Sequence, residues 1–121
     1  MTKSPEPPVC KDITRLKPEL QQDVTYILQA LKHEGYHPFV LETYRTPERA
    51  KWLVDHGCGA ILDSEHCKCR ACDIGFKDEH GNAIWAGDYP GWPRLAHYAR
   101  ERGLVAGHDW KKVDCPHVQM K

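Results

Sequence analysis

Two histidines and two aspartates have the types and spacing of a hydrolytic metal site. Asp73 follows His66 by seven positions, and His117 follows Asp114 by three. Two imidazoles and one carboxylate suit a zinc ion whose fourth tetrahedral position stays open for water. The second carboxylate, Asp114, could take a proton from that water. These residues therefore predict a zinc ion that catalyses hydrolysis.

Two other classes of site are compatible with some of the same residues. The first is a structural zinc without catalysis, but such a site is normally closed by a fourth protein ligand and has no use for Asp114. The second is a cysteine-based zinc module that binds nucleic acid. Lysines plus arginines number 17, aspartates plus glutamates also number 17, and the formal net charge is zero. The absence of a basic stripe argues against nucleic acid as a partner.

Length and composition predict one small domain. A chain of 121 residues is long enough for a core of its own. We expect residues 1–12 to be a disordered, proline-rich lead-in and residues 13–121 to form the zinc-binding domain, as a monomer. No apolar run approaches the roughly 20 residues of a membrane helix, so membrane insertion is not expected. The start lacks the apolar segment of a signal peptide, which predicts synthesis and retention in the cytoplasm.

Helix and strand signals alternate along the chain and predict an α+β fold. Pro18 and Gly35 bound a helix over 18–34, whose apolar residues recur at helical spacing. A strand is expected over 39–45, followed by a second helix that Thr46 caps and Pro47 begins. Further strands are expected from Asp73 and over 104–110 and 113–118, and a third helix from Pro93 to Gly103.

The elements must bring residues distant in sequence to one metal. Six residues between His66 and Asp73 are too many for one helical face, so we expect a loop that turns into a strand. In an ideal strand Asp114 and His117 would point to opposite faces. Pro116 cannot donate to a ladder and restricts Cys115, which predicts a bulge or bend that brings both side chains together.

Six cysteines leave several interpretations open. Cys67, Cys69 and Cys72 lie in or beside the ligand segment, with Cys58 and Cys115 on either side of it in sequence. The favoured interpretation is that they are small packing residues. A second, cysteine-bound zinc and disulfides formed outside the cytoplasm are the alternatives, although no complete four-cysteine pattern is present.

The motifs together resemble the zinc D-Ala-D-Ala carboxypeptidase and L-alanyl-D-glutamate endopeptidase family, which includes VanY-type enzymes and phage endolysins. Four stretches carry the resemblance over nearly the whole chain, and they are Tyr44–Arg49, Ser64–Asp73, Gly103–Lys111 and Asp114–His117. It implies a Hedgehog-like fold, an antiparallel sheet packed with about three helices.

The resemblance also assigns roles to single residues. It implies that His66, Asp73 and His117 bind Zn²⁺ and that Asp114 is the general base. It also implies that Arg45 stabilises the oxyanion, a charge that develops only in the transition state. From the residues alone, without the metal motif, the favoured interpretation of Arg45 is a surface arginine paired with Glu42 or Glu48.

Ser64 is expected to donate or accept a hydrogen bond near the substrate or the metal. One position departs from the family pattern, because Cys69 stands where glycine is usual. If that position has positive φ, cysteine is strained there by about 1 kcal/mol or more. Val118, in place of an aromatic residue, is a milder change.

The predicted function is that of a zinc metallopeptidase that cuts peptidoglycan stem peptides between L-Ala and D-Glu. D-Ala-D-Ala carboxypeptidase activity is the alternative, and a non-catalytic zinc-binding domain is the alternative of another class. The small size and the absent signal peptide predict a phage endolysin that reaches the bacterial cell wall after holin-type release.

Overall fold

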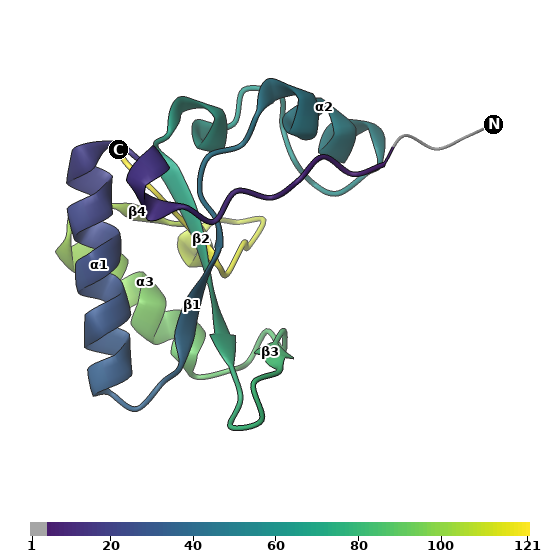
Figure 1. Cartoon of the computed structure of the whole chain (residues 1–121). Coiled ribbons are helices and arrows are strands. Elements are labelled where there is room, and N and C mark those ends of the chain that lie inside the picture. Colours follow the sequence, from purple (N-terminus) through teal and green to yellow (C-terminus); the bar gives the residue numbers. More distant parts are fainter. Residues whose placement is uncertain (1–4) are drawn as a thin grey trace.

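The computed structural model describes residues 5–121, which form three α-helices and a mixed-length antiparallel sheet (Figure 1). The helices are α1 (Pro18–His33), α2 (Pro47–Asp55) and α3 (Gly91–Glu101), with 3₁₀ turns η1 (Ile13–Arg15), η2 (Glu65–Lys68) and η3 (Gly107–Asp109). The strands are β1 (Pro38–Glu42), β2 (Ala71–Lys77), β3 (Ala83–Ile84), β4 (Val105–Ala106) and β5 (His117–Gln119). None of the helices in this part of the chain is long and apolar enough to cross a membrane.

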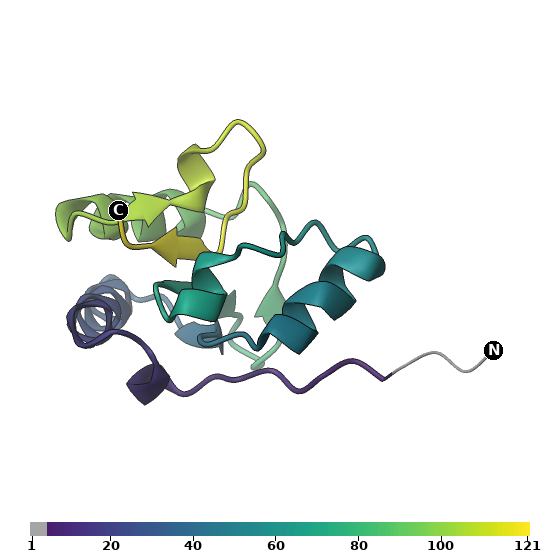
Figure 2. The same cartoon turned by 90° about the horizontal axis from the view of Figure 1, so that it is seen from above.

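The sheet is built around β2. Its strand order is β1-β2-β5-β4, β3 pairs with the far end of β2, and every pairing is antiparallel. Helices α1 and α3 lie together beside the sheet, whereas α2 lies away from them (Figures 1 and 2). The predicted α+β architecture with three helices and an antiparallel sheet is confirmed.

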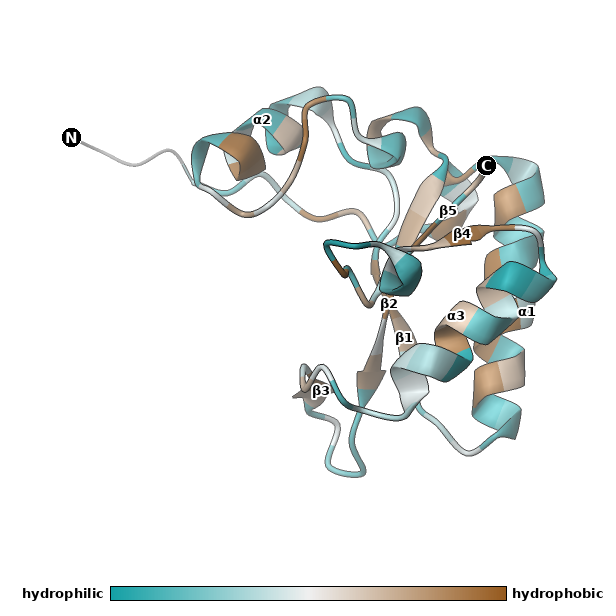
Figure 3. Ribbon diagram, turned by 180° about the vertical axis from the view of Figure 1, so that it is seen from behind, coloured by the Kyte–Doolittle hydropathy of each residue, from teal (hydrophilic) through white to brown (hydrophobic). Residues whose placement is uncertain are grey.

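One hydrophobic core joins α1, α3 and the sheet. Figure 3 shows hydrophobic residues on β2, β4 and β5 and on the parts of α1 and α3 next to them. The first helix buries four of the five residues that its periodicity indicated, and they are Leu20, Val24, Ile27 and Leu31. The fifth, Leu28, is partly buried against the core. The sheet and α3 contribute Ile74, Phe76, Trp92, Leu95 and Val118. This core fixes β2 and β5, which carry two of the candidate metal ligands.

Local signals located the first two helices well. Pro18 occupies the first turn of α1, and Gly35 follows its end with φ +97°. Thr46 caps α2 because its side chain accepts a hydrogen bond from the Arg49 backbone N–H. These signals act within a few residues, so they do not depend on the rest of the fold.

The later elements differ from the predictions in their bounds. Helix α3 begins at Gly91 and not at Pro93, because proline is tolerated anywhere in a first turn, where no intrahelical donor is needed. The strand predicted over 104–110 ends at Ala106, where a 3₁₀ turn begins. The strand predicted over 113–118 starts only at His117.

The predicted lead-in falls partly outside the described residues. Within 5–12, the Cys10 carbonyl accepts a hydrogen bond of 2.8 Å from the Thr43 backbone N–H. The Pro7 carbonyl accepts one of 3.1 Å from Arg49 Nη1, and Glu6 lies 3.5 Å from the same nitrogen. These contacts join the segment to the residues around the end of β1 and to α2.

Candidate metal centre

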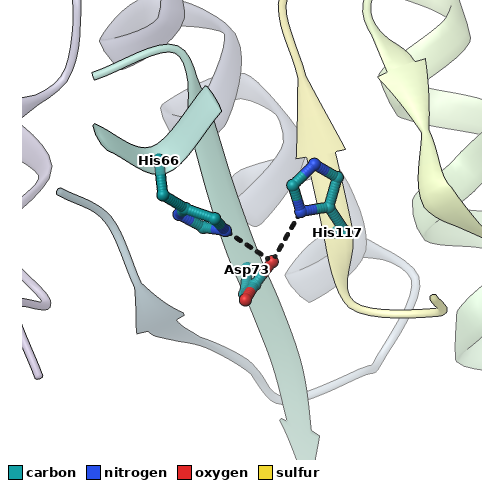
Figure 4. A group of neighbouring side chains, drawn as sticks. All are labelled: His66, Asp73 and His117. Carbon is teal, nitrogen blue, oxygen red and sulfur yellow. Dashed lines mark hydrogen bonds and ion pairs between the residues drawn. The ribbon is translucent and has the colours of Figure 1, made fainter. Parts of the chain in front are cut away.

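Three of the predicted ligands meet at one point between β2, β5 and η2 (Figure 4). Asp73 Oδ1 lies 3.2 Å from His66 Nε2 and 3.1 Å from His117 Nδ1. One ligand atom from each residue lies within 4.8 Å of the others, and His66 and His117 are buried. The group could hold a metal ion, and it is the only such group of His, Cys, Asp and Glu within residues 5–121.

The spacing of these atoms fits a small tetrahedral ion. Two ligand atoms bound about 2.0–2.1 Å from a common zinc lie roughly 3.3 Å apart. The two nitrogen–oxygen distances, 3.2 and 3.1 Å, are close to that value. Two of the three ligand pairs therefore already have the spacing that an ion with nitrogen and oxygen ligands needs.

Neighbouring acceptors fix the orientation of both imidazoles. His66 Nδ1 lies 2.8 Å from the backbone carbonyl of Thr43, and His117 Nε2 lies 2.7 Å from Gln119 Oε1. A carbonyl oxygen only accepts hydrogen bonds, so the nitrogen next to it carries the proton. The other nitrogen of each ring faces the Asp73 carboxylate, where an ion would bind it in place of a proton.

Two hydrogen bonds fix the position of the His66 backbone. Ser64 begins η2, and its hydroxyl accepts a hydrogen bond of 3.2 Å from the His66 backbone N–H. The carbonyl of His66 accepts one of 3.1 Å from the backbone N–H of Arg45. Ser64 thus shapes the turn that carries His66, and it also lines the cleft described below.

Cys69 adopts the strained conformation that the departure from glycine indicated. It ends η2 with φ +61° and ψ +27°, and it is the only non-glycine residue within 5–121 with positive φ. The left-handed conformation costs a residue with a Cβ about 1–2 kcal/mol. This conformation lets the chain turn at Cys69 from η2 into β2, which carries Asp73.

Asp114 reaches the centre through a turn. The His117 backbone N–H donates to the Asp114 carbonyl over 3.2 Å, which closes a turn across Pro116, and Asp114 Oδ2 lies 4.0 Å from His117 Nδ1. The bend expected at Pro116 is therefore present. Loss of water around Asp114 and the nearby charge of Asp73 raise the pKa of the Asp114 carboxyl above its ordinary value.

The charges of Asp73 and His117 support each other. Burial by itself would raise the pKa of Asp73, but the hydrogen bonds to His117 and His66 outweigh it and hold that pKa well below its usual range. Burial lowers the pKa of His117, and the contact with Asp73 more than compensates and raises it. Asp73 is therefore ionised, as a metal ligand must be.

Arg45 is not a loosely placed surface residue. Its Nε and Nη2 each lie 3.0 Å from a carboxylate oxygen of Glu42, and both side chains are nearly buried. Arg49 contacts the same carboxylate, with Nε 2.8 Å from Oε2. Burial raises the pKa of Glu42, but the two arginines outweigh that effect and lower it. Sequence reasoning named Glu42 only as one possible partner and missed this two-arginine cluster.

An open cleft of about 770 Å³ contains the centre. The polar side of its lining includes Arg45, Ser64, His66, Asp73 and Asp114. Apolar residues also line it, and Ile61 and Val113 are more than half exposed. A cleft of this size next to the ligand triad can admit a short peptide.

The cysteines do not form a second candidate metal site within residues 5–121. All six are free thiols, and the one group able to hold a metal contains none of them. Cys72 is fully buried in the core, which fits the packing interpretation for that residue. Its burial raises the pKa of its thiol, so it stays protonated.

Comparison with solved structures places this fold. The L-Ala D-Glu endopeptidase ChiX of Serratia marcescens matches with a TM-score of 0.73 and 25% identity, over 90% of this chain and 83% of that one. The chain has a peptidase fold. The resemblance to the D-Ala-D-Ala carboxypeptidase and L-alanyl-D-glutamate endopeptidase family is thereby confirmed.

A second solved structure supports the peptidase fold alone. The LD-carboxypeptidase LdcB, which recognises peptidoglycan, matches with a TM-score of 0.64 and 18% identity. The match covers 87% of this chain and 58% of that one. No family model matches the sequence, and no curated protein does.

Proposed function

We propose that this protein is a zinc-dependent peptidase that hydrolyses the L-Ala–D-Glu bond of peptidoglycan stem peptides. The observation that carries the proposal is the meeting of His66, Asp73 and His117 with Asp114 inside one open cleft. The similarity to an L-Ala D-Glu endopeptidase over most of both chains supports the choice of bond. A zinc ion held by the triad would supply Lewis acidity for the cleavage of an amide.

Asp114 is the proposed general base. Its side chain is half exposed to the cleft, so a water molecule can reach it, and it is not needed to complete the triad. A raised pKa makes its carboxylate a better proton acceptor than an ordinary surface aspartate. It would take a proton from the attacking water and pass a proton to the leaving amine.

Arg45 is the proposed cation for the oxyanion. The bonds to Glu42 use Nε and Nη2 and leave Nη1 without a hydrogen-bond partner among residues 5–121. Because the guanidinium is held at two points, it needs little reorganisation when negative charge develops on the amide oxygen. Ser64, which precedes η2 and lines the cleft, is proposed to contact the substrate.

The test is mass spectrometry of purified peptidoglycan after incubation with zinc-loaded protein. We expect a new free amino group on glutamate with the wild type and with Asp88→Asn, a matched change of an exposed aspartate. Asp114→Asn should bind zinc and leave the bond intact. Intact wall peptides from zinc-loaded wild type would contradict the enzyme proposal and favour a structural zinc domain.

The same spectra distinguish the alternative bond. The similarity to an LD-carboxypeptidase fold keeps trimming of a terminal D-Ala as the second candidate. It would appear as release of free alanine, with no new amino group on the remaining stem peptide. Action as a monomer and as an endolysin after holin-type release stays a prediction from the sequence.

A further inference from the structure

The side chain of Gln119 touches the metal centre from outside the predicted site. Its Oε1 lies 2.7 Å from His117 Nε2, while His117 Nδ1 faces Asp73 Oδ1 at 3.1 Å. An amide oxygen accepts hydrogen bonds and cannot donate them, so His117 Nε2 carries a proton. Nδ1, which faces the Asp73 carboxylate, is then the ring nitrogen that an ion would bind in place of a proton.

The strand explains why Gln119 can hold this position. His117 and Gln119 are two residues apart on β5, so their side chains lie on the same face, while Val118 between them is buried in the core. The backbone of Gln119 pairs with Ala71 of β2 on one side and with Val105 of β4 on the other. Both partners restrain the backbone from which the amide reaches His117.

The other histidine has a different kind of acceptor. His66 Nδ1 lies 2.8 Å from the backbone carbonyl of Thr43, which a side-chain substitution does not remove. For His117 the acceptor is a side chain, so its contribution can be tested by mutation. A neutral amide also orients the ring without adding a negative charge beside Asp73 and Asp114.

We propose that Gln119 is a positioning residue of the metal site, which holds His117 in its Nε2–H form and thereby directs Nδ1 to the ion. The inference rests on the proposed function for the presence of a metal. It adds a residue that the sequence motif did not include and names the coordinating nitrogen.

The first test compares zinc affinity in Gln119→Leu and wild type by competition with a chromophoric chelator. Loss of an acceptor behind a metal-bound histidine typically weakens metal binding about 10–100-fold, and we expect a loss in that range. The matched control is Gln29→Leu on the exposed side of α1, which should keep wild-type affinity. A folded Gln119→Leu protein with wild-type affinity would overturn the proposal.

The second test reads the ring directly and does not depend on how Gln119→Leu folds. Nitrogen-15 NMR of zinc-loaded wild type should show His117 with Nδ1 bound to zinc and a proton on Nε2. Gln119→Glu keeps an acceptor, so it should preserve this form and bind zinc at least as tightly. Coordination through Nε2, or weaker binding by Gln119→Glu, would overturn the proposal.

These readouts are independent of peptidase activity. Wild type that binds zinc through Nδ1 but leaves wall peptides intact would contradict the proposed function and leave the role of Gln119 standing. Unchanged zinc affinity in Gln119→Leu, together with normal cleavage, would contradict the role of Gln119 and leave the proposed function standing.

Discussion

Asp73 and His117 lie directly opposite each other in the antiparallel ladder of β2 and β5. Opposite residues in such a ladder project their side chains on the same face about 5 Å apart, which is a suitable distance for two ligands of one ion. The neighbouring pair, Cys72 with Val118, points to the other face of the sheet and belongs to the core. The candidate metal centre is thus one cross-strand pair completed by His66.

Zinc should stabilise the fold, because the three ligand atoms are assembled only in the folded chain. At free zinc 100 times the dissociation constant, the free energy of unfolding should rise by about 2.7 kcal/mol. The rise can be measured by urea unfolding with and without zinc. His117→Ala should abolish it, and His80→Ala, which changes an exposed loop histidine, should not. Equal stabilisation of His117→Ala would place the ion elsewhere.

Glu42→Gln should both destabilise the protein and slow cleavage. The substitution leaves the nearly buried Arg45 and Arg49 without their carboxylate, and breaking a buried ion pair costs about 3–5 kcal/mol. Urea unfolding and peptide hydrolysis measure the two effects. Glu48→Gln is the control, because Glu48 is exposed and forms no ion pair with Arg45 or Arg49 within residues 5–121. Equal effects of the two variants would show that the Glu42–Arg45 pair contributes no more to stability than an ordinary surface ion pair.

Gly107→Ala should disturb the turn that carries Asp114. A Cβ at Gly107 would collide with the Asp114 backbone carbonyl and approach the His117 Cβ to 3.0 Å. Overpacking of this kind costs about 1–3 kcal/mol, and the displaced Asp114 should lower the rate of hydrolysis. Gly87→Ala is the matched control, since nothing lies within 4 Å of the added Cβ. Stability and activity equal to those of Gly87→Ala would contradict the prediction.

Cys69→Gly should stabilise the fold by up to about 1 kcal/mol. Glycine removes the left-handed strain of about 1–2 kcal/mol. Its greater chain entropy in the unfolded state lowers the free energy of unfolding and offsets part of this stabilisation. Cys69→Ala separates strain from thiol chemistry, because alanine keeps the Cβ and should show no comparable gain. Urea unfolding under reducing conditions measures both. A similar gain in both variants would attribute the effect to the thiol.

Glu34 should make stability depend on pH between about 4.5 and 2. Arg94, followed by the Tyr98 hydroxyl, lowers the pKa of Glu34 from 4.5 to about 2 and links the end of α1 to α3. A lowered pKa in the folded state means that this stabilisation is complete above pH 4.5 and is lost as the pH falls through 2.

The measurement is urea unfolding of wild type and Glu34→Gln across that pH range. Wild type should be the more stable at neutral pH, and the difference should shrink toward pH 2. Glu79→Gln, a change of an exposed glutamate in a loop, should show no such trend. A constant difference from pH 7 to pH 2 would exclude the ionisation of Glu34 as its cause.

The amino-acid sequence by itself determined the features that depend on near neighbours. Pro18 and Gly35 bound α1, and Thr46 caps α2. Each signal acts through backbone conformation or one local hydrogen bond, so it can be read without knowing the fold. The types and spacing of His66, Asp73 and His117 likewise predicted a group that could hold a metal ion.

Only the tertiary structure decided how those residues meet. The register that sets Asp73 opposite His117 joins two strands distant in sequence. The contacts of Glu42 with Arg45 and Arg49, and of Gln119 with His117, join residues near in sequence, but they need side-chain directions that the sequence does not specify. Shifting a strand by one residue would turn every side chain to the other face, and the buried core residues of β2 and β5 select the register. Packing of the whole core therefore decides the geometry of the centre.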